Sequence, residues 1–423
     1  MRLALIALGS RGDVQPYIAL GRGLKDAGHS VRLVTHQNYA RLVSAHGLEF
    51  WPVSGDVQAV AESPEMRALL EKGDFLAINA RTAKEAERAA LNWAAEGLAG
   101  CRDRDLLCAG IGGLFVGLAL AEKLDVPLVQ AYVVPFTPTA AFPGALFPHT
   151  VARFGGRVNR WTHHATRQLL WQGFRAADAR ARREVLGLPP APFLGPHYDG
   201  RRLRRAPTLY GFSPAVLPRP ADWDAGVHVT GYWFLDPDAE WAPPPAVVEF
   251  LERGEPPVCI GFGSMSQRRP EETTDLILRA LALAKRRALL LSGWDGLRAA
   301  SLPDHVLAVD ALPHAWLFPR VAAVVHHGGA GTTAAGLRAG VPSIVIPFFG
   351  DQPFWGQRVA DLGVGPAPIP RARLTAERLA QAIQQAVSNQ AMRQRAAELG
   401  AAIRAEDGVA RAVAVVQDFA RRQ

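Results

Sequence analysis

The sequence predicts two α/β domains in tandem, each built around a doubly wound parallel sheet. Short apolar runs typical of buried parallel strands alternate with amphipathic helical segments in both halves of the chain. A chain of 423 residues is also too long for one ordinary core and suits two cores of about 200 residues each. Sheets of this kind bind ligands beyond the carboxyl ends of their strands.

The first half opens on a strand–helix–strand unit. Residues 3–8 are uniformly apolar, residues 16–27 carry apolar side chains at helical spacing, and Gly28 ends that helix. The alternation then continues along the chain. We expect strands at 3–8, 31–35, 106–109, 127–132 and 207–212, and helices at 16–27, 114–123 and 152–186.

The second half repeats this plan after a proline-rich stretch with little periodicity. We therefore divide the chain into an N-terminal domain (1–213), an interdomain linker (214–256) and a C-terminal domain (257–423) that ends in closing helices. Strands are expected at 257–262, 288–292, 306–309, 321–326 and 343–347, and helices at 271–287, 332–339, 374–388 and 389–422.

Composition limits the possible classes of function. Lys and Arg exceed Asp and Glu by 47 to 39, a net charge of +8, but no basic cluster has the aromatic spacing of an RNA-binding module, so we expect no nucleic-acid partner. Cys101, Cys108 and Cys259 form no C-x-x-C pair, which fits a reducing compartment. We find no signal-peptide core, and the longest uncharged run, 106–121, is too short for a membrane span. These features predict a cytoplasmic protein.

The segment 326–333, HHGGAGTT, carries the clearest chemistry, because it joins an apolar strand to a helix. Gly329 and Gly331 let the backbone approach a ligand, and the following helix points its positive end at the same place. Thr332 adds a hydroxyl group, and His327 can donate to a phosphate oxygen. We interpret the segment as a cradle for a diphosphate; the alternative is a tight turn with a capping threonine.

Two blocks make the sequence recognisable. One runs from PHAWLFP at 313–319 through 326–333 to PFFGDQP at 347–353, and the other is GSRGDVQP at 9–16. Together they resemble the motifs of the UDP-glycosyltransferases, in particular the branch that holds the sterol glucosyltransferases and the bacterial antibiotic glycosyltransferases. The resemblance covers essentially the whole chain. It implies the GT-B fold: two Rossmann-like domains facing a central cleft, with acceptor binding in the N-terminal domain and nucleotide-sugar binding in the C-terminal domain.

The resemblance also implies inverting transfer of a hexose from a UDP- or dTDP-sugar to a hydroxyl group of a hydrophobic small molecule, such as a sterol, terpenoid or polyketide aglycone. UDP-glucose is the default donor of the family. The implied donor-binding residues are Ser10, Arg11, Gly12, Ser264, Trp294, Trp316, His327, Gly329, Gly331, Thr332, Asp351 and Gln352. Asp351 and Gln352 would bind sugar hydroxyls, and Trp316 would stack on or near the base. A turn-forming Asp351 and a core Trp316 are the alternatives.

Asp13 is the expected catalytic base, since the resemblance places a Gly-Asp pair in the first loop where many enzymes of this fold carry a histidine. The acceptor hydroxyl must lose a proton as the new bond forms, and a positioned carboxylate can take it. Arg11, His327 and a helix end can stabilise the charge on the leaving diphosphate. The alternative role for Asp13 is to cap the helix that follows, and both roles can hold at once.

An aromatic, proline-rich loop in the first half predicts an apolar acceptor pocket. Its aromatic residues include Phe136, Phe142 and Phe147, which we expect to bind the acceptor. The stretch 153–183 that follows holds eight arginines and one acidic residue, Asp178. A basic helix of this kind can contact an anionic bilayer, which would place the protein at the inner membrane face; the alternative is a solvated helix packed on its own domain.

We expect no bound metal, no cofactor beyond the nucleotide sugar and no obligate protein partner. Asp103-Arg104-Asp105 is formally a D-x-D motif, but it lies between a helix end and a strand, outside the context in which that motif binds manganese. Two other functions stay open: a sugar-nucleotide 2-epimerase of the same fold, and a catalytically inactive homologue that acts as a helper protein. The sequence leaves the acceptor, the donor base, the sugar and the oligomeric state open.

Overall fold

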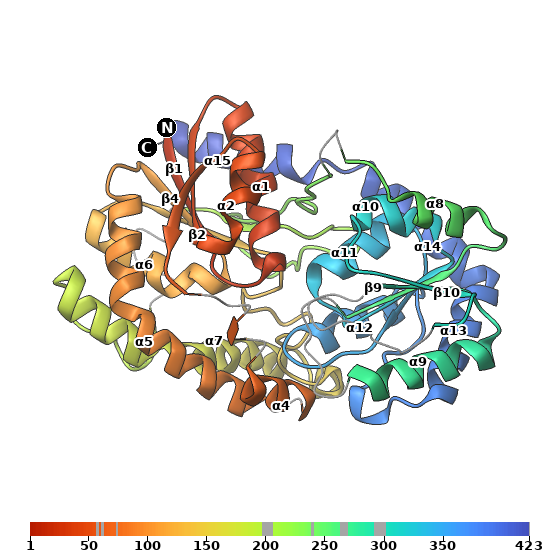
Figure 1. Cartoon of the computed structure of the whole chain (residues 1–423). Helices are drawn as coiled ribbons and strands as arrows, with labels where there is room; N and C mark the ends of the chain where they lie inside the picture. The colour runs from red at the N-terminus through yellow and green to blue at the C-terminus, as the bar shows by residue number, and fades with distance from the viewer. Residues whose placement is uncertain are drawn as a thin grey trace. The chain divides into compact units, whose positions relative to one another are not determined.

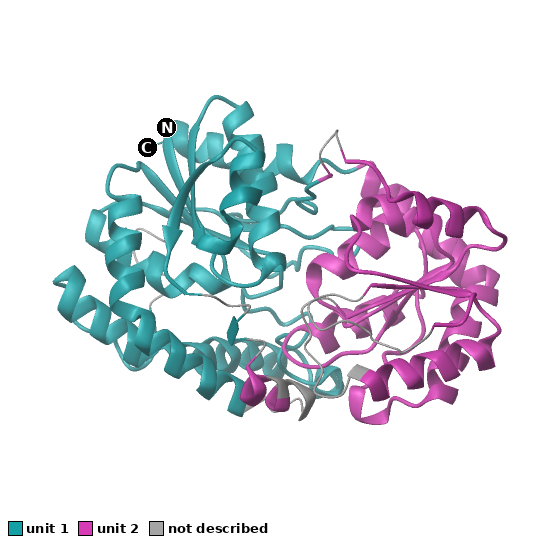
Figure 2. Ribbon diagram, in the orientation of Figure 1, with its two compact units in different colours: residues 1–60, 76–235, 406–423 teal, residues 61–75, 236–405 magenta. Residues whose placement is uncertain are grey.

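The structure, a computed structural model, describes most of the chain as two compact units (Figure 2). Unit 1 comprises residues 1–60, 76–235 and 406–423, and unit 2 comprises residues 61–75 and 236–405. The described residues are 1–55, 59–60, 63–72, 75–196, 206–237, 241–262, 270–291 and 302–422.

Unit 1 is built on a seven-stranded parallel sheet with the order β3-β2-β1-β4-β5-β6-β7 (Figure 1). Its strands are β1 (Arg2–Ile6), β2 (Ser30–His36), β3 (Glu49–Val53), β4 (Leu106–Ala109), β5 (Leu128–Tyr132), β6 (Thr208–Tyr210) and β7 (Val227–Val229). Its helices are α1 (Arg11–Asp26), α2 (Ala40–Ala45), α5 (Phe75–Cys101), α6 (Leu114–Leu124), α7 (Gly156–Ala181) and α15 (Gly408–Arg421), with short turns η1 (Gln37–Tyr39), η2 (Ile111–Gly113), η3 (His149–Phe154) and η4 (Arg182–Leu186).

Unit 2 repeats the plan on a five-stranded parallel sheet, order β10-β9-β8-β11-β12. Its strands are β8 (Val258–Gly261), β9 (Ala288–Leu291), β10 (Val306–Val309), β11 (Ala323–His326) and β12 (Ser343–Val345). Its helices are α4 (Pro64–Lys72), α8 (Pro245–Glu252), α9 (Pro270–Ala284), α10 (His314–Leu317), α11 (Ala330–Ala339), α12 (Gln352–Asp361), α13 (Ala376–Ser388) and α14 (Gln390–Arg404), with η5 (Phe318–Arg320) and η6 (Arg371–Arg373).

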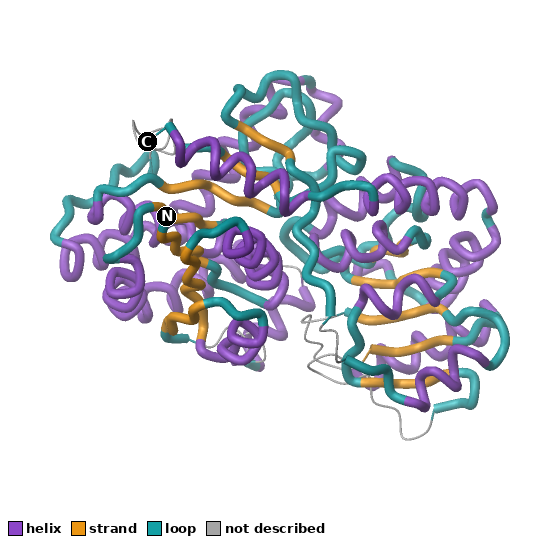
Figure 3. The backbone as a smooth tube through the Cα atoms, turned by 90° about the horizontal axis from the view of Figure 1, so that it is seen from above, coloured by secondary structure: helices purple, strands orange, loops and turns teal. Residues whose placement is uncertain are grey.

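Each sheet is covered on both faces, which explains the continuous apolar runs of its strands (Figure 3). In β1, Leu3 and Leu5 point into the core beneath α1 and α15, whereas Ala4 and Ile6 point into the core beneath α5 and α6. This alternation confirms the predicted doubly wound α/β class. Among the described residues, no helix has the length and the apolar run that crossing a membrane would need.

The predicted linker, 214–256, contains regular structure. Residues 227–229 form β7, the edge strand of the unit 1 sheet, and unit 1 continues to Leu235. Residues 245–252 form α8, which packs Val247 and Phe250 into unit 2. A three-residue strand and an eight-residue helix give too little periodicity to stand out in a proline-rich sequence. Strand β3 and the 27-residue helix α5 were likewise absent from the sequence interpretation.

The last predicted helix, 389–422, is two helices that belong to different units. Asp407 breaks the run and caps α15, where its carboxylate accepts a hydrogen bond from the backbone of Ala410 at 2.9 Å. Helix α14 stays in unit 2, but α15 packs Val413 and Val416 against α1 in the core of unit 1. The prediction of helix for this stretch was correct, and its assignment to the C-terminal domain was not.

Helix α15 begins where two backbone segments touch. A Cβ atom added to Gly408 would lie 2.4 Å from the carbonyl oxygen of Tyr232 and 2.5 Å from the carbonyl carbon of Gly231. Gly231 itself has φ +107°, a conformation that favours glycine. Only a residue without a side chain therefore fits at the start of α15.

We expect Gly408→Ala to destabilise unit 1 by about 1–3 kcal/mol, because the new methyl group meets backbone atoms that cannot rotate away. Thermal melting followed by circular dichroism measures the effect. The matched control is Gly331→Ala in α11, where an added Cβ has no neighbour within 4 Å. Equal melting temperatures for the Gly408 variant and the native protein would contradict the close contact.

Candidate functional site

The turn from β1 into α1 folds the side chain of Asp13 back over its own backbone. The backbone N–H of Ser10 donates to Asp13 Oδ2 at 2.8 Å, and the Ser10 hydroxyl donates to the same oxygen at 2.9 Å. Gly9 makes this possible: its φ is +141°, and a Cβ there would lie 2.5 Å from Asp13 Oδ2. Arg11 and Gly12 lie exposed in the same turn.

Asp13 is therefore the third helical residue of a capping box whose N-cap is Ser10, and it still presents a carboxylate. The hydrogen bonds recorded among the described residues all reach Oδ2, so Oδ1 is the oxygen left to take a proton. The side chain is accessible to solvent, but the protein around it desolvates the carboxyl group and raises its pKa, against the lowering effect of the Ser10 hydrogen bonds. A raised pKa makes the carboxylate a stronger base.

In unit 2, the turn from β11 into α11 holds the predicted diphosphate cradle. Gly328 has φ +90°, Gly329 is the N-cap of α11, and a Cβ on Gly331 would meet open space. His326 Nδ1 accepts a hydrogen bond from the N–H of Gly328 at 3.0 Å, which fixes the turn. The backbone thus forms a tight turn between β11 and α11, and the N-terminal end of α11 carries partial positive charge. Thr332 is half-buried in the first turn of α11.

His327 lies directly against this turn, because a Cβ on Gly329 would be 2.4 Å from His327 Nε2. Its Nδ1 is buried without a hydrogen bond among the described residues. Burial lowers the pKa of His327 to about 4, with a further lowering effect from His314. His327 is therefore neutral near pH 7, and a neutral imidazole can still donate one N–H group to an anion.

The structure brings Asp351 and Gln352 to the same place. A Cβ on Gly328 would lie 3.0 Å from the backbone oxygen of Gln352, so the two turns touch. Gln352 Oε1 accepts from the N–H groups of Phe348 and Phe349 at 2.8 and 3.2 Å, and Asp351 Oδ2 accepts from Trp355 Nε1 at 2.9 Å. Each side chain thus uses one oxygen to hold the turn.

Of the three remaining predicted donor residues, only Trp316 lies among the described residues. Trp316 is half-buried, with its ring centroid 5.4 Å from that of Trp241 and 4.7 Å from the Arg320 guanidinium group. It packs against the core of unit 2, as the alternative of a core aromatic residue expected. Its contact with a base stays a prediction. Ser264 and Trp294 lie outside the described residues.

His314 is a residue that the sequence interpretation left without a role. It stacks on Phe318 with ring centroids 4.4 Å apart, and it is close enough to His326 and His327 to lower the pKa of both. Burial and these neighbours lower the pKa of His326 to about 3. His314 belongs to the recognised block at 313–319, but no local sequence pattern shows that α10 contacts α11.

The predicted acceptor loop, residues 136–148, lies in unit 1 and is held in place by polar contacts. Phe136 is buried, with the Arg167 guanidinium group 5.0 Å from its ring. Phe142 and Phe147 are half-buried. The ring centroid of Phe142 lies 5.7 Å from that of His163, and the ring centroid of Phe147 lies 6.0 Å from that of Trp161. Phe142 and Phe147 are therefore the accessible members of the set, and acceptor binding by all three stays a prediction.

Two residues missed by sequence reasoning hold this loop. The Tyr210 hydroxyl accepts from the N–H groups of Phe136 and Thr137 at 3.0 and 2.6 Å. The Asp222 carboxylate accepts from the Thr139 hydroxyl at 2.6 Å and the Ala140 N–H at 2.8 Å. Partial burial raises the pKa of Asp222, but these hydrogen bonds and the nearby Arg160 outweigh it and lower the pKa to about 2, so the anchor stays charged at ordinary pH values.

The D-x-D segment is occupied by ion pairs. Asp103 pairs with Arg32 and Arg104 at 3.1 Å, and Asp105 pairs with Arg2 at 2.7 Å. These carboxylates therefore stabilise the start of the sheet. Within the described part of the chain, no group of three or more His, Cys, Asp or Glu side chains is arranged to hold a metal ion.

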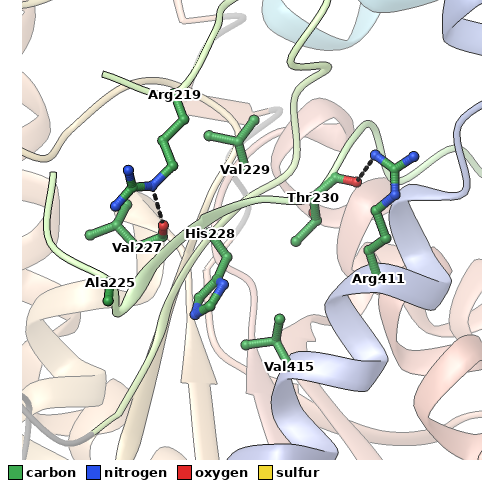
Figure 4. Close-up of a pocket in the computed structure, with 8 residues that line it drawn as sticks. All are labelled: Arg219, Ala225, Val227, His228, Val229, Thr230, Arg411 and Val415. Carbon is green, nitrogen blue, oxygen red and sulfur yellow. Dashed lines mark hydrogen bonds between the residues drawn. The ribbon is translucent and has the colours of Figure 1, made fainter. Parts of the chain in front are cut away.

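A cavity of about 520 Å³ opens between the edge strand β7 and α15, away from these residues (Figure 4). Arg219 Nε donates to the carbonyl oxygen of Val227 at 3.0 Å, and Arg411 Nη1 donates to that of Thr230 at 3.4 Å. Arg219 thus binds a carbonyl group of the edge strand β7, and Arg411 binds that of the residue directly after the strand. None of the predicted site residues lines this cavity.

Comparison with known proteins agrees with this geometry. Residues 3–143 match the glycosyltransferase family 28 N-terminal domain, and residues 291–417 match the C-terminal domain of erythromycin biosynthesis protein CIII-like proteins. The chain is 38% identical to the sterol 3-beta-glucosyltransferase UGT80B1 of Arabidopsis thaliana over 98% of its own length and 67% of that relative. It is also 38% identical to a sterol 3-beta-glucosyltransferase of Aspergillus fumigatus, of which it spans 30%.

Solved structures show the same fold. The kitacinnamycin glycotransferase superposes with a TM-score of 0.69 at 21% identity, covering 99% of this chain and 98% of that one. The glycosyltransferase VinC, solved in complex with DTDP, superposes with a TM-score of 0.66 at 20% identity over the whole of both chains.

Two parallel α/β units, each with a glycine turn at the carboxyl end of a central strand, together with these matches define a GT-B glycosyltransferase. The chain belongs to the UDP-glycosyltransferase superfamily, in the branch that contains the sterol 3-beta-glucosyltransferases. The fold class and the family expected from the two sequence blocks are thereby confirmed. The roles of the individual site residues stay predictions.

We expect Asp13→Asn to reduce kcat by roughly 10²–10⁴-fold with little change in donor affinity. The amide oxygen keeps an acceptor for the two Ser10 donors, so the turn is preserved and only the base is lost. The activity of the native protein should fall as the pH drops through the pKa of Asp13, because the protonated carboxyl group cannot act as a base. This pKa is higher than that of an ordinary aspartate. Pre-steady-state kinetics and a pH–rate profile measure this, and near-native turnover of the variant would exclude Asp13 as the base.

Ser10→Ala is the matched control. It removes a hydrogen bond that lowers the Asp13 pKa but leaves the carboxylate in place, so the acidic limb of the profile should move to higher pH.

We expect His327→Ala and Asp351→Ala each to raise the donor KM by about tenfold or more and to lower kcat, because a hydrogen bond to a charged group contributes roughly 1.5–3 kcal/mol. Titration calorimetry with the nucleotide sugar measures the binding part. Trp355→Phe is the control for Asp351: it removes the hydrogen bond to Asp351 Oδ2 and keeps the carboxylate. Unchanged donor affinity in both alanine variants would disprove the donor assignments.

Proposed function

We propose that this protein transfers a hexose from a nucleoside diphosphate sugar to a hydroxyl group of a sterol or a similar polycyclic, apolar acceptor, with inversion at the anomeric carbon. The observation that carries the proposal is the pair of half-sites: a carboxylate with a raised pKa at the end of β1, and a glycine turn with a buried histidine at the end of β11. We take the first to bind the acceptor hydroxyl and the second to bind the donor.

In the proposed reaction, the acceptor oxygen forms a bond to the anomeric carbon while its proton passes to Asp13 Oδ1. The bond between the anomeric carbon and the diphosphate oxygen breaks, and the diphosphate leaves with the electron pair. The N–H groups at the start of α11, the imidazole of His327 and the guanidinium group of Arg11 would stabilise the added negative charge. Asp351 and the amide end of Gln352 would orient the sugar hydroxyls.

The acceptor class is supported by two independent features. Phe142 and Phe147 are half-buried in a loop whose backbone is fixed by Tyr210 and Asp222, which favours a rigid apolar surface. The relatives with 37–38% identity are named sterol 3-beta-glucosyltransferases. Because lipid-like acceptors reside in membranes, we propose in addition that the protein contacts a bilayer peripherally.

A helper protein without activity is the second candidate, and a 2-epimerase is the third. Asp13, His327, Asp351 and Gln352 are all present, which favours transfer over the helper function. We propose that charge on the leaving diphosphate is neutralised by backbone amides, a helix end and basic side chains, so that no metal ion or further cofactor takes part.

The test is mass spectrometry of products from a matrix of UDP- and dTDP-sugars against sterols, polyketide aglycones, free sugars and peptides, with excess EDTA present to remove metal ions. We expect glycosides of apolar acceptors and release of the nucleotide only when acceptor is present. Preference for hydrophilic sugars would overturn the acceptor class, epimerised donor would favour the epimerase, and no turnover of any kind would favour the helper. Activity that needs added Mn²⁺ or Mg²⁺ would contradict the metal-free mechanism.

A further inference from the structure

We propose that one face of α7 and the segment strapped across it form a docking surface for an anionic lipid bilayer. The proposal rests on the proposed function in one respect, because a lipid-like acceptor gives the docking its purpose. We call this surface the α7 face. Its apolar members are Phe154, Trp161, Phe193 and Leu194, and its basic members are Arg153, Arg157 and Arg175.

The apolar members are unusually exposed for their size. The exposed fractions are 60% for Phe154, 61% for Trp161, 62% for Phe193 and 71% for Leu194. They account for four of the six large apolar side chains that stand out as exposed among the described residues; the other two are Met1 and Leu283. Their gathering around a single helix indicates an interaction surface.

One side of α7 carries Trp161 and holds the segment with Phe193 and Leu194. Arg157, Trp161, Gln168, Gln172 and Arg175 follow one another at intervals of three, four or seven residues, which is one side of a helix. Arg157, Trp161 and Arg175 are exposed, whereas Gln168 and Gln172 are half-buried. With a rise of about 1.5 Å per residue, Trp161 and Gln172 are about 16 Å apart along the axis. The opposite side of α7 carries buried residues, among them Asn159, Thr162 and His163.

The segment with Phe193 and Leu194 is anchored so that its side chains stay outside. Gln168 Nε2 and Gln172 Nε2 both donate to the carbonyl oxygen of Phe193, at 2.9 and 2.8 Å. Trp171 Nε1 donates to the carbonyl oxygen of Pro192 at 3.1 Å. The backbone is thus fixed on the helix, and the two apolar side chains project from it.

The charge of the α7 face fits anionic headgroups. From residue 140 to residue 177 the chain contains no Asp or Glu. Arg153 and Arg175 lie with their guanidinium groups 4.7 and 5.2 Å from the rings of Phe154 and Phe193, so cations flank the apolar side chains. Aromatic side chains beside arginines are the composition found at bilayer interfaces.

The surface also touches the predicted acceptor loop. The ring of Phe147, an expected acceptor contact, lies 6.0 Å from that of Trp161 in an edge-to-face arrangement. An apolar acceptor taken from a bilayer at the α7 face would therefore meet aromatic side chains continuously into the loop. This continuity favours a membrane over an acidic protein as the partner.

Flotation with vesicles tests the proposal. We expect the native protein to float with phosphatidylcholine vesicles that contain phosphatidylserine, to float much less with phosphatidylcholine alone, and to be released by high salt. The double variant Trp161→Ala, Phe193→Ala should lower the partition coefficient by about tenfold or more, and Arg157→Gln, Arg175→Gln should abolish the preference for phosphatidylserine.

The matched controls are Leu283→Ala, an exposed leucine of α9, and Arg393→Gln, an exposed arginine of α14; both should float like the native protein. Circular dichroism checks that each variant is folded. The single variant Phe193→Ala leaves the contact between Trp161 and Phe147 in place. With acceptor supplied in cyclodextrin this variant should retain its activity, whereas with acceptor in vesicles its activity should fall.

Three results would overturn the docking surface: no flotation of the native protein, equal flotation of the double variant, or sedimentation showing that the face instead joins two copies of the chain. If the native protein floats and the double variant does not, but the native protein transfers sugar to no acceptor in any form, the proposed function is refuted and the docking surface stands.

Discussion

The turn from a buried parallel strand into a helix is the constraint on which both half-sites depend. Because each sheet is covered on both faces, every strand must leave it at the carboxyl edge, and the chain must reverse within a few residues to pack a helix. At β1 this requires Gly9 in a conformation that favours glycine, and at β11 it requires Gly328. The same tight turns leave helix N-termini free to face a ligand, so the geometry that closes the core also provides the proposed anion sites.

The predicted site residues in both units use one atom to hold the fold and leave another for the proposed chemistry. Asp13 caps α1 through Oδ2, Asp351 holds the indole of Trp355 through Oδ2, and Gln352 satisfies two backbone N–H groups through its amide oxygen. This double use gives each side chain one orientation before any substrate arrives, which reduces the entropy lost on binding. It also means that Asp13 can both cap the helix and act as a base. In the same way, Asp351 can both form the turn and bind a ligand.

Helix α7 joins the acceptor loop to the outside of unit 1. On its buried side, the Thr162 hydroxyl accepts from Gly144 and His163 contacts the carbonyl oxygen of Phe142, so the loop is fixed by hydrogen bonds. On its exposed side, arginines and aromatic side chains stay in water. A helix that only covered the sheet would need neither feature. The arginine-rich composition seen in the sequence thus has two components: a part that forms ion pairs at the sheet, such as Arg32 and Arg104, and a part that remains exposed along α7.

By itself the sequence determined the two α/β domains, most strands and the two glycine turns, because apolar periodicity and turn chemistry act over a few residues and the recognised blocks are contiguous. Only the tertiary structure decided that α15 packs on α1, since an amphipathic pattern does not say which core it faces. It also decided that Tyr210 holds a loop 74 residues away, that Asp222 is a second anchor, and that His314 adjoins His327. These roles depend on long-range contacts, whose hydrogen bonds and charges exist only once the chain has folded.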